Sequence, residues 1–305
     1  MDPRTLSIVV TVVDGGAALR RCLTALMSQA GAPAMEVLVP YDSTIASVAL
    51  WVQEFPGVRF VDAGLLTSKR PPSSAGGQHE LIDRRRAAGL AAAGGDLVGV
   101  IEDRGVPRAD WAATAVRLHQ ALPNLVIGGA VENGRDHVLN WAVYWCDFGR
   151  YQLPFERGPR HYVTDVNVVY KRRALEQTRD IWQARYHEPL VHWALERAGE
   201  TLLLTPELVV DQLRDGLTIA GLLSERVAWG RLFGSLRVRD ASLPRRIALT
   251  VMAPLLPAVL FWRLMRDQVR KGTPSGRLIR VGPAALLLVS AWAVGEALGY
   301  ATGKP

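Results

Sequence analysis

The first 131 residues alternate between short apolar runs and longer segments with a helical repeat of apolar positions. Runs rich in β-branched residues predict strands at 6–13, 35–41, 58–62, 97–101 and 125–131. Apolar residues three or four positions apart predict helices at 17–30, 47–55, 81–93 and 109–122. Strands and helices that alternate at this spacing predict an α/β fold with a doubly wound, mostly parallel sheet flanked by helices.

The pattern weakens after residue 131 and then changes character. An aromatic cluster at 141–151 precedes a strand-like run at 163–170, a helix at 190–198 and a strand at 201–205. Beyond them, the uniformly apolar segments 247–265 and 281–300 are about long enough to span a membrane.

The first apolar segment contains Pro254 and Pro257 and has basic residues on both sides. A simple span would place these flanks on opposite sides of the membrane, whereas basic residues favour the cytoplasmic side. We therefore prefer a re-entrant or interfacial hairpin, with both flanks in the cytosol, to two full spans. Two buried helices of a soluble domain are a third alternative, which the uniform apolar character disfavours.

The balance of basic and acidic residues also changes shortly before the apolar segments. Residues 1–215 contain 23 Lys and Arg against 25 Asp and Glu, whereas residues 216–305 contain 13 against 4. A basic, apolar tail favours membrane lipids over nucleic acid as a partner, and no basic patch interleaved with aromatic residues indicates nucleic-acid binding. We expect a folded domain at 1–215, a basic amphipathic linker at 216–246 and a membrane-associated hairpin at 247–305. The folded domain would lie on the cytoplasmic face of the cell membrane.

Cysteine and histidine spacing argues against two common kinds of site. Cys22 and Cys146 form no CxxC pair, which indicates reduced core residues. The six histidines contain no HExxH pattern, so we do not expect a structural zinc site.

The most informative chemical feature is the run from Val98 to Pro107. Four mostly apolar residues are followed directly by Glu102, Asp103 and Arg104. A strand that ends in adjacent carboxylates places charge at the carboxyl edge of the sheet, where α/β folds bind ligands. Adjacent acids there suit a divalent cation that holds phosphates, and a solvated acidic turn is the plain alternative.

Six stretches in this order resemble family 2 glycosyltransferases, which have the GT-A fold, over about residues 5–215. They lie at 7–14, 37–44, 84–90 with 93–98, 102–104, 167–172 and 187–188. The fourth occupies the position of the family's DxD motif, and the last resembles its acidic ED pair.

The resemblance implies an inverting transfer of a sugar from a nucleotide-diphospho-sugar, with a UDP-sugar favoured, to a hydroxyl group. The acceptor would be lipid-linked or a growing polysaccharide, in line with the apolar tail. The departing diphosphate needs a metal or fixed cations, and the attacking hydroxyl needs a base.

The resemblance also assigns the site residues. Glu188 would be the general base, and Asp103 the ligand of Mn²⁺ or Mg²⁺. The donor would be bound by Asp14, Asp42, Arg84, Glu102 and Asn167. Asp14 and Asp42 would hold the base and the ribose. Glu102 would face the diphosphate, and Arg84 would reach a phosphate.

Two residues depart from the family pattern. Arg104 replaces the last acid of the DxD motif, and a guanidinium cannot ligate a metal. Either Asp103 alone carries the metal, or Arg104 itself pairs with phosphate. His187 replaces the first acid of the ED pair, which leaves Glu188 as the only carboxylate there.

Other interpretations stay open at this stage. Asp14 suits a helix N-cap, Asp42 a turn, and Glu188 the first turn of a helix. A non-catalytic, membrane-bound partner protein that keeps the fold would explain Arg104. A nucleotidyltransferase would need a lysine in the glycine-rich loop after the first strand, and the sequence Asp14-Gly15-Gly16 has none.

Overall fold

The computed structural model describes residues 5–305, which form two compact units. The first comprises the described residues up to Lys69, Gly77–Gly134 and Leu153–Leu213. The second comprises Arg70–Gly76, Arg135–Gln152 and Arg214–Pro305. The aromatic segment 141–151 therefore groups with the C-terminal part of the chain, although the sequence analysis places it within the domain at 1–215.

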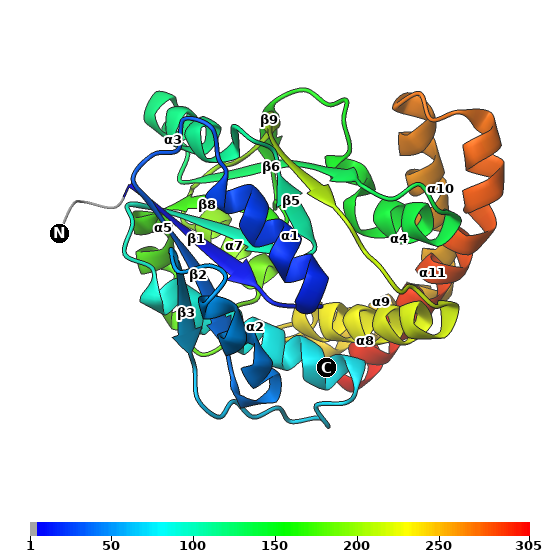
Figure 1. The fold of residues 1–305 in the computed structure, drawn as a ribbon. Coiled ribbons are helices and arrows are strands. Elements are labelled where there is room, and N and C mark those ends of the chain that lie inside the picture. Colours follow the sequence, from blue (N-terminus) through cyan, green and yellow to red (C-terminus); the bar gives the residue numbers. More distant parts are fainter. Residues whose placement is uncertain (1–4) are drawn as a thin grey trace. The chain divides into compact units, whose positions relative to one another are not determined.

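The centre of the first unit is a sheet with the strand order β3-β2-β1-β4-β8-β6-β9-β5, in which β7 also pairs with β9 (Figure 1). Its strands are β1 Leu6–Thr11, β2 Met35–Tyr41, β3 Val58–Asp62, β4 Leu97–Glu102, β5 Gly105–Pro107, β6 Val126–Asn133, β7 Gly158–Arg160, β8 Asn167–Lys171 and β9 Leu202–Gln212. The strands β1, β2, β3, β4, β6 and β9 point one way, whereas β5, β7 and β8 run opposite. The predicted mostly parallel α/β sheet is confirmed.

The direction in which strands are added reverses beside β1. The chain moves outward from β1 to β2 and β3, and then places β4 on the other side of β1. Thr11 at the end of β1 pairs with Glu102 at the end of β4. Open α/β sheets bind ligands at such a reversal, outside the carboxyl ends of the strands.

Helices pack on both faces of this sheet. They are α1 Gly16–Met27, the 3₁₀ helix η1 Ser43–Val52, α2 Ala75–Ala92, α3 Trp111–Ala121, α5 Arg172–Gln177, α6 Arg179–Trp182 and α7 Glu188–Arg197. Apolar side chains of α1 and α3 share one core with Ile8 and Val10 of β1. Val9 points to the other face, where α2 lies so close that a side chain at Gly89 would collide with it.

Three elements differ from their predicted form. The helix expected at 47–55 is the 3₁₀ helix η1, which begins at Ser43. The strand expected from residue 163 begins only at Asn167, because its N–H donates to the Thr164 carbonyl at 3.2 Å and closes a turn. The strand expected at 201–205 continues to Gln212.

The second unit is helical. Its helices are α4 Val138–Phe148, the 3₁₀ helices η2 Gly149–Tyr151 and η3 Ala253–Leu255, α8 Ile219–Arg237, α9 Leu243–Met252, α10 Leu256–Arg270 and α11 Ser275–Thr302. The stretches Leu243–Arg270 and Ser275–Thr302 are long and apolar enough to cross a membrane, by length and composition. Of the most apolar 18 residues in each stretch, 6% are buried within the protein in the first and 39% in the second.

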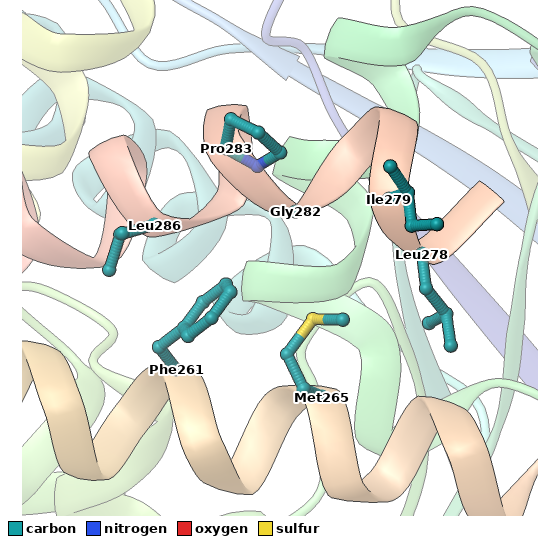
Figure 2. Close-up of a pocket in the computed structure, with 7 residues that line it drawn as sticks. All are labelled: Phe261, Met265, Leu278, Ile279, Gly282, Pro283 and Leu286. Atoms are coloured by element: carbon teal, nitrogen blue, oxygen red, sulfur yellow. The ribbon is translucent and has the colours of Figure 1, made fainter. Parts of the chain in front are cut away.

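An open groove of about 400 Å³ lies between α10 and α11 (Figure 2). Its lining is apolar and consists of Phe261, Met265, Leu278, Ile279, Gly282, Pro283 and Leu286.

Glycines at four-residue spacing join α11 to α8. A Cβ atom on Gly295 or Gly299 would collide with backbone of α8, and one on Gly230 or Gly234 would collide with backbone of α11. This reciprocal GxxxG packing brings the two backbones together. Glu296, between the glycines of α11, is buried but paired with Arg237 at 3.0 Å.

Candidate active site

The carboxyl ends of β1, β2 and β4 bring four of the predicted acids to one edge of the sheet. Asp14 follows β1, Asp42 follows β2, and Glu102 and Asp103 close β4. Because the three strands are parallel neighbours, residues far apart in sequence meet at the strand-order reversal.

Asp103 holds the turn between β1 and α1. Its carboxylate accepts the backbone N–H groups of Val13 at 3.1 Å, Asp14 at 3.1 Å and Gly15 at 2.6 Å. Gly15 has a φ of 65°, in the left-handed region that favours glycine. Burial raises the pKa of Asp103 to about 6, and the hydrogen bonds from Gly15 and Val13 oppose the rise.

Asp14 and Arg104 form a two-pronged ion pair above this turn. The Arg104 Nε donates to Asp14 Oδ2 at 2.9 Å, and its Nη2 donates to Oδ1 at 2.6 Å. The Asp14 side chain is 34% exposed, so a ligand can reach the pair from solvent.

The side chains at the DxD position therefore do not fit a divalent cation in this arrangement. Both oxygens of Asp103 accept N–H groups, and Arg104 brings a positive charge. Glu102 lies against Arg86, at 3.4 Å, and accepts from Gln212 at 3.5 Å. The geometry gives the predicted metal site at Asp103 no support.

Asp42 and Arg85 offer polar atoms without partners at the end of β2. Asp42 is fully buried and 3.1 Å from Arg85 Nε, and its Oδ1 also accepts from Thr44 at 2.8 Å. Within the described residues, Asp42 Oδ2 and Arg85 Nη2 have no hydrogen-bond partner. Buried polar atoms that lack partners are costly, and ligand hydroxyl or carbonyl groups would satisfy them.

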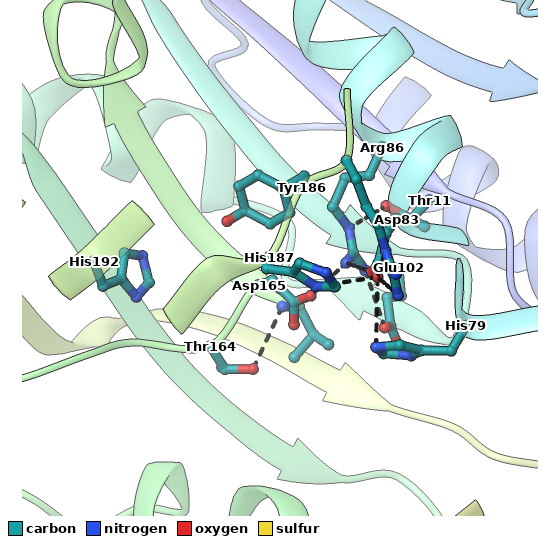
Figure 3. Close-up of polar contacts among 12 residues, drawn as sticks. Thr11, His79, Asp83, Arg86, Glu102, Thr164, Asp165, Tyr186, His187 and His192 are labelled. Carbon is teal, nitrogen blue, oxygen red and sulfur yellow. Dashed lines mark hydrogen bonds and ion pairs between the residues drawn. The ribbon is translucent and has the colours of Figure 1, made fainter. Parts of the chain in front are cut away.

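Arg86 connects three elements at the centre of the edge (Figure 3). Its Nε donates to Thr11 Oγ1 at 3.0 Å, and its Nη1 lies 2.6 Å from Asp165 Oδ2. Its Nη2 faces Glu102. Burial, and then the charge of Asp165, raise the pKa of Glu102 to about 7 against the opposing effect of Arg86.

Glu188 and Asp165 bring two carboxyl groups together beside Arg86. Burial, and then the charge of Asp165, raise the pKa of Glu188 well above its usual value. Glu188 lies at the first position of α7, where it holds its proton to higher pH than an exposed carboxyl group does.

A buried polar chain lies behind this pair. The Tyr170 hydroxyl is 2.6 Å from the Tyr186 hydroxyl and 2.7 Å from His192 Nε2. Arg86 stacks over the Tyr186 ring, with its guanidinium carbon 5.6 Å from the ring centroid. These contacts fix the segment that leads into α7.

Two predicted donor-binding residues have their side chains bonded to other parts of the protein. Asn167 is fully buried, where its amide accepts from Trp111 Nε1 at 2.8 Å and donates to the Ala130 and Leu208 carbonyls. These contacts give Asn167 a role in sheet packing, and its role in donor binding stays a prediction. Arg84 lies 3.4 Å from Glu80 on the same helix and is half-buried.

Sequence reasoning missed Arg85, Arg86 and Asp165. The stretch 84–90 lies on the correct helix, but the sequence does not reveal that Arg85 and Arg86 are buried. The sequence pattern places Asp165 within the strand-like run 163–170. The one feature that could have indicated a role in the site is its position directly before the apolar residues at 166–170.

A second polar cluster adjoins the first. His79, Asp83 and His187 each place a ligand-type atom within 4.8 Å of the others (Figure 3). Burial lowers the pKa of His187 to about 4, and the nearby Asp83 carboxylate opposes that effect.

The fold is shared with two solved structures. One is TarS 1–349 from S. aureus, which is 12% identical, with 96% of this chain and 90% of that chain covered and a TM-score of 0.50. The other is the mannosyltransferase PcManGT from Pyrobaculum calidifontis in complex with GDP-Man and Mn²⁺, which is 17% identical, with 97% and 87% covered and a TM-score of 0.52. No family model and no curated protein sequence matches the chain. The likeness confirms the glycosyltransferase-type fold expected from the sequence.

Proposed function

We propose that the protein is an inverting glycosyltransferase that moves a sugar from a nucleotide-diphospho-sugar to a hydroxyl acceptor at a membrane. The observation that carries this proposal is the pair of half-buried acids Glu188 and Asp165 beside Arg86 and the ends of β1 and β4. A carboxyl group whose pKa is raised above its ordinary value is a stronger base when ionised, which suits it to accept a proton from an attacking hydroxyl.

The donor would occupy the reversal between β1 and β4. Asp42 and Arg85 would bind the nucleoside through the atoms that lack partners. Arg104 would exchange Asp14 for the diphosphate, because a guanidinium pairs well with phosphate oxygens. The positive charge would stabilise the leaving group. Mn²⁺ or Mg²⁺ bound together with the donor is the alternative, and the solved mannosyltransferase is a complex with GDP-Man and Mn²⁺.

Glu188, once ionised, would take the proton of the acceptor hydroxyl as its oxygen attacks the anomeric carbon. The bond from that carbon to the diphosphate breaks in the same displacement, and the nucleoside diphosphate leaves with the electron pair. Asp165 would be a positioning residue that holds Glu188 and sets its pKa.

The acceptor or its carrier would be a lipid. The apolar side chains on α9 and α10 are largely exposed, including Val251 and Trp262. The groove between α10 and α11 suits a hydrocarbon chain, and arginines such as Arg263 and Arg280 would complement anionic headgroups. We propose that this part of the chain rests on the cytoplasmic leaflet of the cell membrane, in a pathway that builds a surface polysaccharide.

A panel of nucleotide-diphospho-sugars tests the proposal. Detergent-solubilised full-length protein is mixed with each donor and a membrane lipid extract, and nucleoside diphosphate release is followed with Mn²⁺, with Mg²⁺ and with EDTA. We expect release with one donor, dependent on the lipid extract and retained in part with EDTA.

The same panel addresses the second candidate function. A non-catalytic partner protein is favoured by the pairing of Asp14 with Arg104, which fills the position expected for the donor. No release and no donor binding under any condition would overturn the transferase proposal in favour of that candidate.

A further inference from the structure

The cluster of His79, Asp83 and His187 has the composition of a metal site. His79 Nε2 is 3.6 Å from Asp83 Oδ2, and His187 Nδ1 is 3.2 Å from the same oxygen. Ligand atoms bound to one tetrahedral zinc ion at about 2.0–2.2 Å lie about 3.3 Å from one another. The two distances therefore bracket the separation that a bound ion requires.

Local structure explains why these residues meet. His79 and Asp83 are four residues apart on α2, so they lie on one face of the helix, one turn from each other. His187 directly precedes α7. The Tyr186 N–H donates to the Asp83 carbonyl at 3.2 Å and fastens this segment to α2. Two elements distant in sequence thus supply a preformed set of donors.

We propose that His79, Asp83 and His187 bind a divalent transition-metal ion of the zinc class, separate from any ion that accompanies the donor. Two imidazoles and a carboxylate suit Zn²⁺, Co²⁺ or Fe²⁺, whereas Mg²⁺ and Ca²⁺ prefer oxygen ligands. The fourth position would hold water. The sequence analysis missed the site because its ligands do not form an HExxH pattern.

Arg185 competes with the ion for the Asp83 carboxylate. Its Nε and Nη2 both lie 3.0 Å from Asp83 Oδ2, and its Nη1 is 4.0 Å from Glu80 Oε1. A carboxylate oxygen accepts two partners, but two cations on one oxygen repel each other. When the ion binds, Arg185 would turn toward Glu80, which is also buried.

The ion would affect the candidate active site through the backbone that joins His187 to Glu188. His187 is bonded directly to Glu188, so a metal on His187 would fix the start of α7 against α2. This would restrict the proposed base to one position. The binding itself does not depend on the proposed function, and the experiment measures it separately from activity.

Cobalt titration of the full-length protein in detergent tests the proposal. The protein is stripped with a chelator and carries no histidine tag. Co²⁺ is followed by its visible absorption, and Zn²⁺ is measured by displacement of Co²⁺. We expect one equivalent of tightly bound ion with the strong absorption of a four-coordinate site, displaced by Zn²⁺ and unaffected by Mg²⁺.

Variants separate this site from adventitious binding. His79→Gln and His187→Gln should each weaken Co²⁺ binding by at least about tenfold. His161→Gln is the matched control, since His161 is exposed on the same unit and bonds to Glu196. Arg185→Gln should bind Co²⁺ more tightly, because it removes the competing cation. Thermal melts verify that each variant is folded.

Two results would overturn the proposal. One is the failure of the folded wild-type protein to bind Co²⁺ or Zn²⁺ in large excess. The other is binding that His79→Gln and His187→Gln leave as it is in His161→Gln. Neither result depends on whether sugar transfer is observed.

Discussion

At the scale of residues, the candidate site contains carboxylates that are already bonded to other groups of the protein. Asp103 is the clearest case, since it occupies the position of a metal ligand and is bonded to three backbone N–H groups. A charged acceptor satisfies several donors at once, which explains why an acid is needed at a turn as tight as Val13–Gly15.

Asp103→Asn should therefore destabilise the protein. The amide keeps one acceptor oxygen but presents an NH₂ group to backbone donors. This should lower the free energy of unfolding by on the order of 1–3 kcal/mol. Thermal melts should show a lower Tm and weaker donor binding than the exposed control Asp110→Asn. A normal Tm together with lost Mn²⁺ binding would instead restore Asp103 as the metal ligand.

Asp165→Asn tests how the pKa of Glu188 is set. The charge of Asp165 raises that pKa after burial, so its removal should lower it. Transfer requires ionised Glu188 and rises as the pH rises through this pKa. The rising limb of the pH–rate profile should thus move to lower pH in Asp165→Asn. An unchanged profile would show that another group controls the limb.

The acids at the ends of the strands were predictable because their positions follow from the hydrophobic pattern. The partners of those acids were not. Asp165 meets Glu188 only because a turn at 164–167 precedes β8, and Arg85 faces inward because of how α2 packs on the sheet. Long-range packing of this kind leaves no local pattern in the sequence.

At the scale of elements, the alternation of strands and helices over the first 131 residues predicted the parallel half of the sheet. The short strands β5 and β7 were missed, since three residues carry no periodicity. The apolar helices α10 and α11 were anticipated, but the glycine face that joins α11 to α8 was not. Uniform apolar character hides a packing face that consists of small residues.

Gly295→Ala tests that face. Its new methyl group would collide with the Val227 carbonyl of α8. This collision should lower the free energy of unfolding by about 1–3 kcal/mol. Gly276→Ala is the matched control on the same helix, because nothing lies within 4 Å of the added atom. Thermal melts in detergent should show a lower Tm only for Gly295→Ala, and equal melting temperatures would refute close packing of α8 and α11.

At the scale of the whole molecule, the C-terminal helices are not a detachable anchor. The second unit includes α4 and α8 as well as α9, α10 and α11. Truncation before Arg245 would remove α11 from α8 and expose its glycine face. This truncation should therefore give poorly folded protein in place of a soluble domain, and membrane association is better tested on the full chain.

Full-length protein should float with vesicles. The expected partners are vesicles that contain anionic lipid, because exposed apolar side chains on α9 and α10 insert while arginines meet the headgroups. Association should be weaker with neutral vesicles and should persist in part at high salt. Protein that remains soluble without detergent and stays in the dense fraction would contradict the membrane assignment.

The central claim is that Glu188 is the base of a glycosyl transfer, and Glu188→Gln tests it most directly. The matched control is Glu196→Gln, on the same helix but paired with His161 outside the site. With the donor identified, we predict that Glu188→Gln lowers kcat by about 10²–10⁴-fold and leaves the donor Kd close to the wild-type value, while Glu196→Gln matches wild type in both. A folded Glu188→Gln protein that transfers sugar at the wild-type rate would contradict the account.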